Sequence, residues 1–149
     1  MVKNKYRKAV FIVVYSVEKE IKYIILKRKK HWKGWEFPKG KIEKFETKRQ
    51  TARREVKEET GLNVLKIKKF HEKGFYKYKN KLKDRPGIIG QTYTLFAVKV
   101  SKGNGKIKID KKEHYFGKWI SYEKAIKLLT WENQKRCLKI VNNWLKRKK

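Results

Sequence analysis

The chain has 149 residues, of which 39% are apolar, 39% are charged and 13% are aromatic. This length corresponds to one domain, and the aromatic content argues against intrinsic disorder, because disordered chains contain few aromatic residues. The longest apolar run, Ala9 to Tyr15, is far shorter than the roughly 20 residues of a membrane span, and no signal-peptide pattern is present. A single cysteine, Cys137, excludes an internal disulfide and a cysteine metal cluster. We expect one domain over residues 1–149, located in the cytoplasm and without membrane association.

The charge of the chain is strongly positive, with 44 basic residues against 14 acidic ones and a net charge of +30. Such a charge attracts polyanions, so RNA is a candidate partner through a basic surface. However, 36 of the basic residues are lysines and they are spread along the chain, whereas phosphate-binding surfaces more often use clustered arginines. Compositional bias therefore explains the charge equally well.

The first half of the chain contains two predicted strands and one predicted helix. Residues rich in Val, Ile and Tyr predict strands over 8–15 and 22–28, joined by a polar hairpin turn. A segment with Gly and Pro follows. Thr47 and Gln50 can then form a capping box at the start of a helix, which Gly61 can end.

The second half of the chain contains three predicted strands and two predicted helices. The strands are expected over 63–76, 91–100 and 114–120, with basic loops over 77–90 and 101–112. Ser121 is the expected N-cap of a helix to Leu129, and Thr130 that of a last helix through Leu145. This order of elements indicates a mixed sheet flanked by helices, an α/β or α+β sandwich.

Acidic residues are concentrated in one short stretch, since five of the twelve glutamates fall between positions 43 and 59. On the predicted helix, Glu55, Glu58 and Glu59 are spaced i, i+3 and i+4, so their carboxylates share one face and repel one another. A bound cation would resolve this conflict. Carboxylates without His or Cys nearby in sequence favour Mg²⁺ or Mn²⁺. The alternative is a solvated acidic face with lysine partners.

The surroundings of these carboxylates form a specific motif. Residues 40–62 read G-KIEKF-E-TKRQTAR-R-E-V-K-E-E-T-G-L, which is similar at every specified position to the Nudix box, G-x5-E-x7-R-E-U-x-E-E-x-G-U, where U is a bulky aliphatic residue. The chain thus resembles the Nudix hydrolases, whose fold is an α/β/α sandwich with a mixed β-sheet. The resemblance implies hydrolysis of a nucleoside diphosphate linked to another group, with Mg²⁺ or Mn²⁺ and water.

The resemblance also implies roles for individual residues. The metal-binding positions of the family match Gly40, through its carbonyl group, and Glu55, Glu58 and Glu59. Glu46 and Arg54 match a structural ion pair, with a phosphate contact of Arg54 as the alternative, and Gly61 matches the turn that ends the helix.

The general base is expected in the box helix, at Glu58 or Glu59, or on a later loop. Glu113 precedes a predicted strand, and Lys111-Lys112-Glu113-His114 resembles the segment that holds a late glutamate in dinucleoside polyphosphate hydrolases. This likeness implies that Glu113 is a late metal ligand or base, the alternative being an exposed loop residue.

The segment Trp35-Glu36-Phe37-Pro38-Lys39-Gly40 resembles the W-x-F-P-K-G sequence of the asymmetrical diadenosine tetraphosphate hydrolases. The resemblance implies that Lys39 meets a phosphate, the alternative being one more surface lysine, and that the products are ATP and AMP. Tyr76 and Tyr115 are candidates to stack an adenine, the alternative being that each is an ordinary core or surface residue. His31 and Lys33 are candidate phosphate contacts, with a solvated loop as an equal alternative.

Other activities remain open from the sequence. Gly90-Gln91 before the strand 92–100 is similar to the G-Q-x-x-x-x-F segment of RNA 5′-pyrophosphohydrolases, but those enzymes usually have F-P-Q-G where this chain has Phe37-Pro38-Lys39-Gly40. Hydrolysis of nucleoside triphosphates or ADP-ribose is a further alternative. The intact set of glutamates argues against a non-catalytic nucleotide or RNA binder. We expect a monomer.

Overall fold

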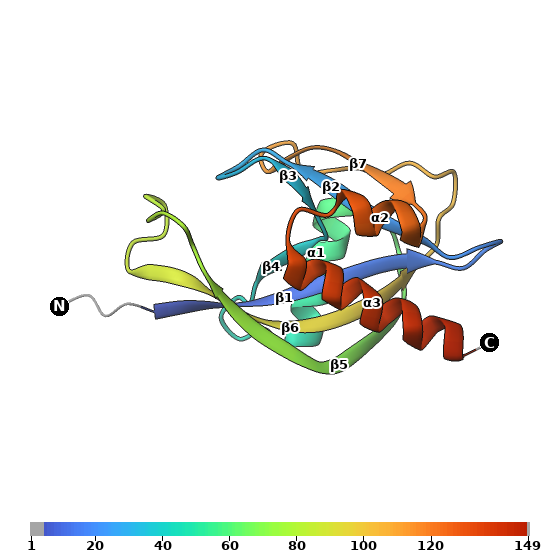
Figure 1. Cartoon of the computed structure of the whole chain (residues 1–149), viewed down its shortest axis with the longest axis horizontal. Coiled ribbons are helices and arrows are strands. Elements are labelled where there is room, and N and C mark those ends of the chain that lie inside the picture. Colours follow the sequence, from blue (N-terminus) through green and yellow to red (C-terminus); the bar gives the residue numbers. More distant parts are fainter. Residues whose placement is uncertain (1–4, 149) are drawn as a thin grey trace.

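A mixed β-sheet forms the centre of the protein, and helices cover both of its faces (Figure 1). The computed structural model describes residues 5–148. Its strands are β1 (Lys5–Ser16), β2 (Lys22–Arg28), β3 (Gly34–Glu36), β4 (Lys39–Lys41), β5 (Val64–Lys77), β6 (Ile88–Val100) and β7 (His114–Ile120), and its helices are α1 (Lys48–Thr60), α2 (Tyr122–Leu128) and α3 (Glu132–Arg147).

The sheet is mixed because one of its pairings is parallel. The strand order is β3-β2-β1-β6-β5, with β4 paired to β1 and β7 paired to β2. β1 runs parallel to β6 along almost its whole length, and the pairings recorded for the other strands are antiparallel.

β1 and β2 pair at Tyr15 and Ser16 and then diverge. The segment from β3 to β4 crosses this opening, because β3 pairs with β2 and β4 pairs with β1. The crossing is fixed at Pro38, whose carbonyl accepts a hydrogen bond from the Ile12 N–H at 3.0 Å. This crossing brings Glu36, Lys39 and Gly40 beside the C-terminal half of α1.

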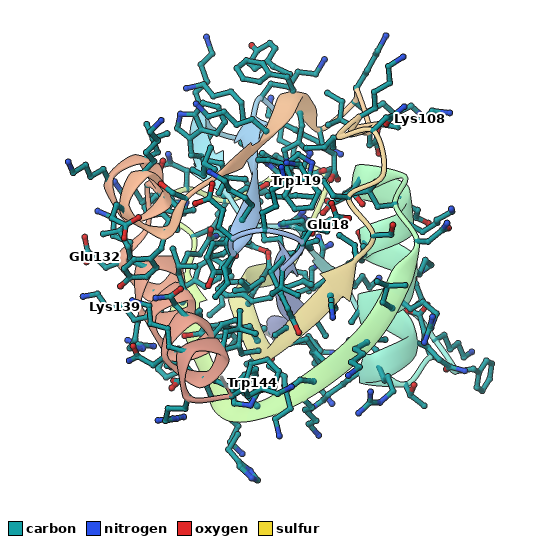
Figure 2. The ribbon with its side chains drawn as sticks, turned by 90° about the vertical axis from the view of Figure 1, so that its right-hand side faces the viewer. Glu18, Lys108, Trp119, Glu132, Lys139 and Trp144 are labelled. Atoms are coloured by element: carbon teal, nitrogen blue, oxygen red, sulfur yellow. The ribbon has the colours of Figure 1, made fainter. Side chains whose placement is uncertain are left out.

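Alternate residues of the central strands pack into two separate cores. Phe11, Val13 and Tyr15 of β1 belong to the core under α2 and α3, while Val10, Ile12 and Val14 belong to the core under α1. Figures 1 and 2 show this arrangement, with α1 on one side of the sheet and α2 and α3 on the other. The expected α/β/α sandwich is confirmed.

Several element boundaries differ from those predicted. β1 begins at Lys5 and β6 at Ile88, because the two strands extend each other by pairing at these residues, so the predicted loop over 77–90 is shorter. The crossing segment, predicted only as a Gly- and Pro-containing stretch, contains the short strands β3 and β4. No helix within residues 5–148 has the length and apolarity required to cross a membrane.

The caps of two helices agree with prediction and one does not. The capping box of Thr47 and Gln50 is present at α1, and the Ser121 side chain accepts a hydrogen bond from the Lys124 N–H at α2. The predicted cap at Thr130 is wrong, since α3 begins after Trp131. The Thr130 hydroxyl oxygen instead accepts a hydrogen bond from the Trp35 N–H at 2.9 Å.

Candidate active site

Three carboxylates of the candidate site lie on α1, whose two ends are fixed by local caps. The helix begins with the capping box at Thr47 and ends at Gly61, whose φ of 72° is a left-handed conformation that favours glycine. Between these ends, Glu55 and Glu59 are largely buried: the Glu55 side chain is 12% exposed, and the whole Glu59 residue is 2% exposed. The Glu58 side chain is 55% exposed. The helix therefore presents a carboxylate face that runs from the interior to the surface.

The buried carboxylates of this face have too few cations to balance them. Burial raises the pKa of Glu55 to about 7, although Arg54 opposes this shift, and Glu58 adds to it. Burial and the neighbouring Glu55, Glu36 and Glu113 raise the pKa of Glu59 well above its ordinary value. A divalent cation would provide the missing positive charge.

Glu59 is held in place from one side only. Its Oε2 accepts a hydrogen bond from the Lys39 N–H at 3.1 Å, while its Oε1 is buried and has no hydrogen-bond partner within residues 5–148. Buried polar atoms are nearly always paired in folded proteins, so this free oxygen is suited to a ligand.

Gly40 lies directly against Glu55. A Cβ atom at position 40 would overlap the Glu55 carboxylate, so a residue with a side chain would displace this group. The absence of a side chain allows the backbone of β4 to approach the carboxylate face closely, which is the approach that a carbonyl ligand from Gly40 requires.

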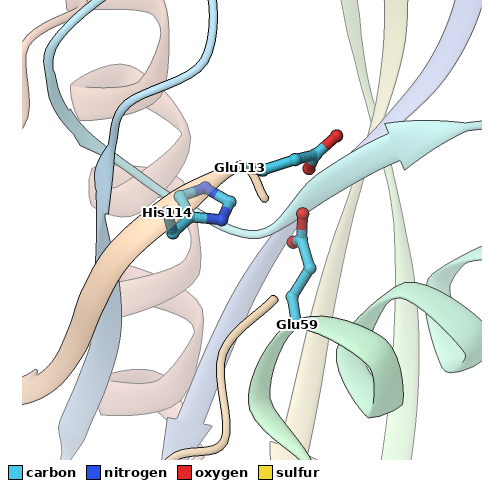
Figure 3. A group of neighbouring side chains, drawn as sticks. All are labelled: Glu59, Glu113 and His114. Atoms are coloured by element: carbon cyan, nitrogen blue, oxygen red, sulfur yellow. The ribbon is translucent and has the colours of Figure 1, made fainter. Parts of the chain in front are cut away.

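Glu113 approaches the same place from a distant part of the chain. Ligand atoms of Glu59, Glu113 and His114 lie within 4.8 Å of one another, and Figure 3 shows Glu59 rising from α1 toward the start of β7. The Glu113 carbonyl accepts hydrogen bonds from the N–H groups of Lys29 at 2.9 Å and Lys30 at 3.3 Å. The structure thus brings the late glutamate next to the box glutamates.

The ion pair between Glu46 and Arg54 forms, and it supports the carboxylate face. Arg54 Nε donates to Glu46 at 2.7 Å and Nη2 donates to the Lys41 carbonyl at 3.0 Å. Arg54 Nη1 also contacts Glu55 at 2.8 Å and Glu58 at 3.2 Å. Arg54 therefore joins the loop before α1 to two carboxylates of the site, with its guanidinium engaged by protein groups.

Sequence reasoning missed a buried ionic cluster beside the site. The Glu36 carboxylate contacts Arg28 at 3.0 Å, His114 at 2.6 Å and Lys39 at 3.4 Å. Burial alone would raise the pKa of Glu36, but Lys39, the hydrogen bond from His114 and Arg28 outweigh it and hold this pKa at about 2. The signal in the sequence was a single acid between aromatic residues, and its partners become neighbours only through strand pairing.

The cluster also contacts Glu113. Arg28 Nη1 lies 3.8 Å from Glu113, and the Arg28 side chain is 4% exposed. His114, which sequence reasoning did not place in the site, has one ring nitrogen engaged with Glu36 and an Nδ1 without a partner among the described residues. Because carboxylates still supply most of the ligand atoms, the residues fit Mg²⁺ or Mn²⁺.

The substrate contacts expected from sequence are only partly assembled. Lys39 lies at the site, but its ammonium group is engaged by Glu36 at 3.4 Å and the Tyr76 hydroxyl at 3.3 Å. His31 is bound to Asp84 at 3.0 Å, and Lys33 is exposed. In this arrangement Lys39 and His31 already have protein partners where phosphates were expected.

The structure places Tyr76 and Tyr115 on separate strands of the sheet. Tyr76 lies on β5 and Tyr115 on β7, and β6, β1 and β2 lie between these strands in the sheet. The ring of Tyr115 has Lys29 as its neighbour, at 5.5 Å. The two tyrosines are therefore not neighbours in the sheet, and adenine stacking by either of them stays a prediction.

A group of aromatic rings, Tyr76 among them, lies around Lys39. The Lys39 ammonium lies 5.9 Å from the Trp32 ring and 5.7 Å from the Tyr76 ring. Trp32 packs edge-on against Trp131 at 5.2 Å, and Tyr76 against Tyr78 at 6.1 Å. Lys39 therefore lies between this aromatic group and the carboxylates, since its backbone N–H binds Glu59.

The fold and the carboxylate face define an α/β/α sandwich of the Nudix type. The Nudix domain family matches residues 5–139. The RNA pyrophosphohydrolase of a Nitratiruptor species is 33% identical over 136 residues, 87% of each chain, and that of Blochmanniella pennsylvanica is 32% identical over 78% of this chain and 77% of its own. The chain belongs to the Nudix family, whose hydrolases act on pyrophosphate bonds.

Solved structures agree on the fold. A protein of Listeria monocytogenes solved as a candidate Nudix hydrolase is 26% identical, with a TM-score of 0.74 over 94% of each chain. The Ap4A hydrolase of C. elegans is 24% identical, with a TM-score of 0.74 over 93% of this chain and 97% of its own.

Proposed function

We propose that the chain is a metal-dependent pyrophosphohydrolase whose cation is held by Glu55 and by carboxylates among Glu58, Glu59 and Glu113, with the Gly40 carbonyl as a further ligand. The observation that carries the proposal is the convergence of these carboxylates, with Glu59 buried and the Glu55 side chain 12% exposed, in a protein of net charge +30. An uncompensated acidic cluster is costly to fold, and a divalent cation with substrate phosphates would stabilise it.

The bound cation, one carboxylate and Arg54 would have different roles in the reaction. When bound, the cation would neutralise charge on the phosphate oxygens and lower the pKa of a bound water. A carboxylate that is not coordinated, Glu58, Glu59 or Glu113, would accept the proton of the attacking water. Arg54 would hold Glu55 and Glu58 in orientation through the contacts described above.

Within this class, we infer that the 5′-triphosphate end of RNA is the best-supported substrate. The two relatives at 33% and 32% identity are RNA pyrophosphohydrolases, and the positive charge suits a polyanionic substrate. Lys39, the phosphate contact expected for a dinucleotide substrate, is paired with Glu36.

Diadenosine tetraphosphate, cleaved asymmetrically to ATP and AMP, is the second candidate. The Trp35 to Gly40 segment and the Glu113-His114 pair favour it. In either substrate, we propose that the aromatic group around Lys39, which includes Trp32 and Tyr76, binds the base nearest the cleaved phosphates.

A product-resolved assay tests both levels of the proposal. Triphosphorylated RNA, diadenosine tetraphosphate, nucleoside triphosphates and ADP-ribose are incubated with Mg²⁺ or Mn²⁺, and the products are separated. Pyrophosphate released from RNA faster than ATP and AMP from the dinucleotide would support the first candidate, and the reverse order would support the second. Full activity with excess chelator would refute the metal-dependent reaction.

Glutamate variants connect the reaction to the carboxylate face. We expect Glu59→Gln and Glu58→Gln to lower turnover by at least ~100-fold, since each removes a ligand or base. Both should remain folded, because loss of a repelling charge does not weaken the helix. Glu43→Gln is the matched control, since Glu43 is exposed and lies outside the cluster. Wild-type turnover in both variants would refute the assignment.

A further inference from the structure

Phe45, in the loop between β4 and α1, combines two unfavourable features. Its side chain is 95% exposed, although exposure of a large aromatic ring to water is unfavourable. Its backbone φ is 67°, a left-handed conformation that residues with a Cβ atom rarely adopt. Folding alone gives no reason for a phenylalanine at this position.

Comparable residues elsewhere in the described chain have local partners that Phe45 lacks. His31 also has a left-handed φ, of 72°, but its ring is bonded to Asp84 at 3.0 Å. Phe75 is 69% exposed, but its ring packs edge-on against Tyr6 at 5.8 Å. The ring interaction recorded for Phe45 is with the neighbouring Lys44, whose ammonium lies 5.3 Å away.

Lys44 lies beside the exposed ring, and a stripe of further basic residues follows on α1. Arg49, Arg53 and Lys57 are exposed on α1 at i, i+4 and i+8, so they form one stripe along the helix. Arg49 donates to the Ile67 carbonyl of β5 at 3.0 Å, which joins this stripe to a strand that carries exposed lysines. Of the acids nearby, Glu43 is exposed, while Glu46 is paired with Arg54.

The loop also lies next to the carboxylate face. Glu46 follows Phe45 in the chain and binds Arg54, which contacts Glu55 and Glu58. A strand of RNA with its 5′ phosphates at these carboxylates can therefore reach the loop. Since phosphates pair with cations and bases stack on aromatic rings, the chemistry of the loop matches single-stranded RNA.

We propose that Phe45 is a stacking site for a nucleobase of single-stranded RNA, and that the stripe of Arg49, Arg53 and Lys57 binds the neighbouring phosphates. This proposal rests on the proposed function for its choice of RNA. It adds a binding surface outside the carboxylate site, and it explains why an aromatic side chain occupies a position that favours glycine.

The test measures binding of a 3′-labelled single-stranded RNA of about 12 nucleotides by fluorescence anisotropy, in chelator so that the RNA is not hydrolysed. We expect Phe45→Gly to raise the Kd at least about fivefold, which corresponds to about 1 kcal/mol of stacking. Phe45→Tyr keeps a ring and should bind as the wild type does. Val17→Ala, which shortens another exposed apolar side chain, should also have no effect.

Two controls separate stacking from charge. Phe45→Gly removes no charge, so the slope of log Kd against log salt concentration should equal that of the wild type. The Kd itself should be higher at every salt concentration. Inorganic polyphosphate carries phosphates without bases, so its affinity should be unchanged in the variant. An RNA Kd within roughly twofold of the wild type, an equal loss of polyphosphate binding, or a wild-type protein that binds no RNA would overturn the proposal.

The outcome is distinguishable from failure of the proposed function. Loss of RNA binding in Phe45→Gly, together with no hydrolysis of triphosphorylated RNA by the wild type, would refute that substrate and support the stacking site. Hydrolysis of RNA by the wild type with unchanged binding in Phe45→Gly would support the substrate and refute the stacking site.

Discussion

Glu36 and Glu59 are two buried carboxylates of this protein whose charges are compensated differently. Both are buried carboxylates, but Glu36 contacts three basic side chains while Glu59 accepts one backbone hydrogen bond and faces other acids. The charge of Glu36 is thus compensated by the protein itself, although its Oε1 has only the Lys39 ammonium nearby, at 3.4 Å, and no hydrogen bond among the described residues. Glu59 is left with an oxygen that has no hydrogen-bond partner among the described residues, and burial with its acidic neighbours raises its pKa because Arg28 compensates its charge only in part.

Arg28→Met should lower the free energy of unfolding by about 3–5 kcal/mol. Removal of one partner from a buried ion pair leaves the other charge poorly compensated, and this costs far more than the intact pair contributes. Arg28 is 4% exposed and its partner Glu36 is fully buried. Urea denaturation in chelator would measure the change.

A surface pair provides the control for this prediction. Glu132→Gln breaks the contact with Lys135, where Glu132 is 88% exposed, and exposed pairs contribute little to stability. Equal, small losses in the two variants would mean that Glu36 does not depend on Arg28 for its charge compensation.

Phe45→Gly should raise the free energy of unfolding. The left-handed backbone costs a residue with a Cβ atom about 1–2 kcal/mol, and glycine loses about 0.5–1 kcal/mol more chain entropy on folding, so a net gain of about 0.5–1 kcal/mol is expected. Phe45→Ala keeps the Cβ atom and should show no comparable gain. Thermal unfolding of the three proteins would test this, and a less stable glycine variant would show that the ring contributes to folding.

At the scale of elements, local signals were predicted well and long-range pairings were not. The ends of α1 depend on Thr47, Gln50 and Gly61, which act within a few residues of themselves, so the sequence was sufficient. Thr130 is an equally good local cap, but the fold gives its hydroxyl to Trp35, 95 positions away. The strands β3 and β4 likewise exist only through their pairing with β2 and β1.

The candidate site follows the same division. The carboxylates of α1 could be predicted because their spacing along a helix fixes a common face. The contact of Glu36 with His114 joins residues 78 positions apart, and no local pattern specifies it. The separation of Tyr76 from Tyr115 has the same cause, since strand order decides which aromatic side chains become neighbours.

Tyr23→Phe tests a link between two elements, β2 and α3. The Tyr23 hydroxyl donates to Asn142 Oδ1 at 2.6 Å in the core, and burial raises the pKa of Tyr23, so the hydroxyl remains a donor. Its removal leaves the buried Asn142 oxygen without this partner, at a cost of about 1–3 kcal/mol. Denaturant unfolding should show this loss, whereas Tyr115→Phe, at a half-exposed residue, should change little. A neutral Tyr23→Phe would mean that water replaces the hydroxyl.

At the scale of the whole molecule, the positive charge is spread over the surface while many of the acids gather at one place. Five of the 14 acidic residues, Glu36, Glu55, Glu58, Glu59 and Glu113, lie in or beside the candidate site. Figure 2 shows basic side chains such as Lys108 and Lys139 on the outside of the fold. The basic side chains on the rest of the surface therefore repel one another, while the acidic site attracts cations.

This self-repulsion predicts that salt stabilises the protein. A large net charge weakens the compact state, and the Debye length falls from about 30 Å at 0.01 M salt to about 8 Å at 0.15 M. With 44 basic and 14 acidic residues, screening should relieve more repulsion than attraction. Each 1 kcal/mol gained should raise the Tm by roughly 2–4 °C.

Thermal unfolding across a series of potassium chloride concentrations would measure this effect. Chelator must be present throughout, because a cation bound to the carboxylate face would itself stabilise the folded state. Potassium glutamate should act as the chloride salt does if screening is general, whereas an effect limited to one anion would indicate binding of that anion. A Tm that falls as salt is added would show that the ion pairs, Arg28 with Glu36 and Arg54 with Glu46 among them, outweigh the repulsion between the lysines.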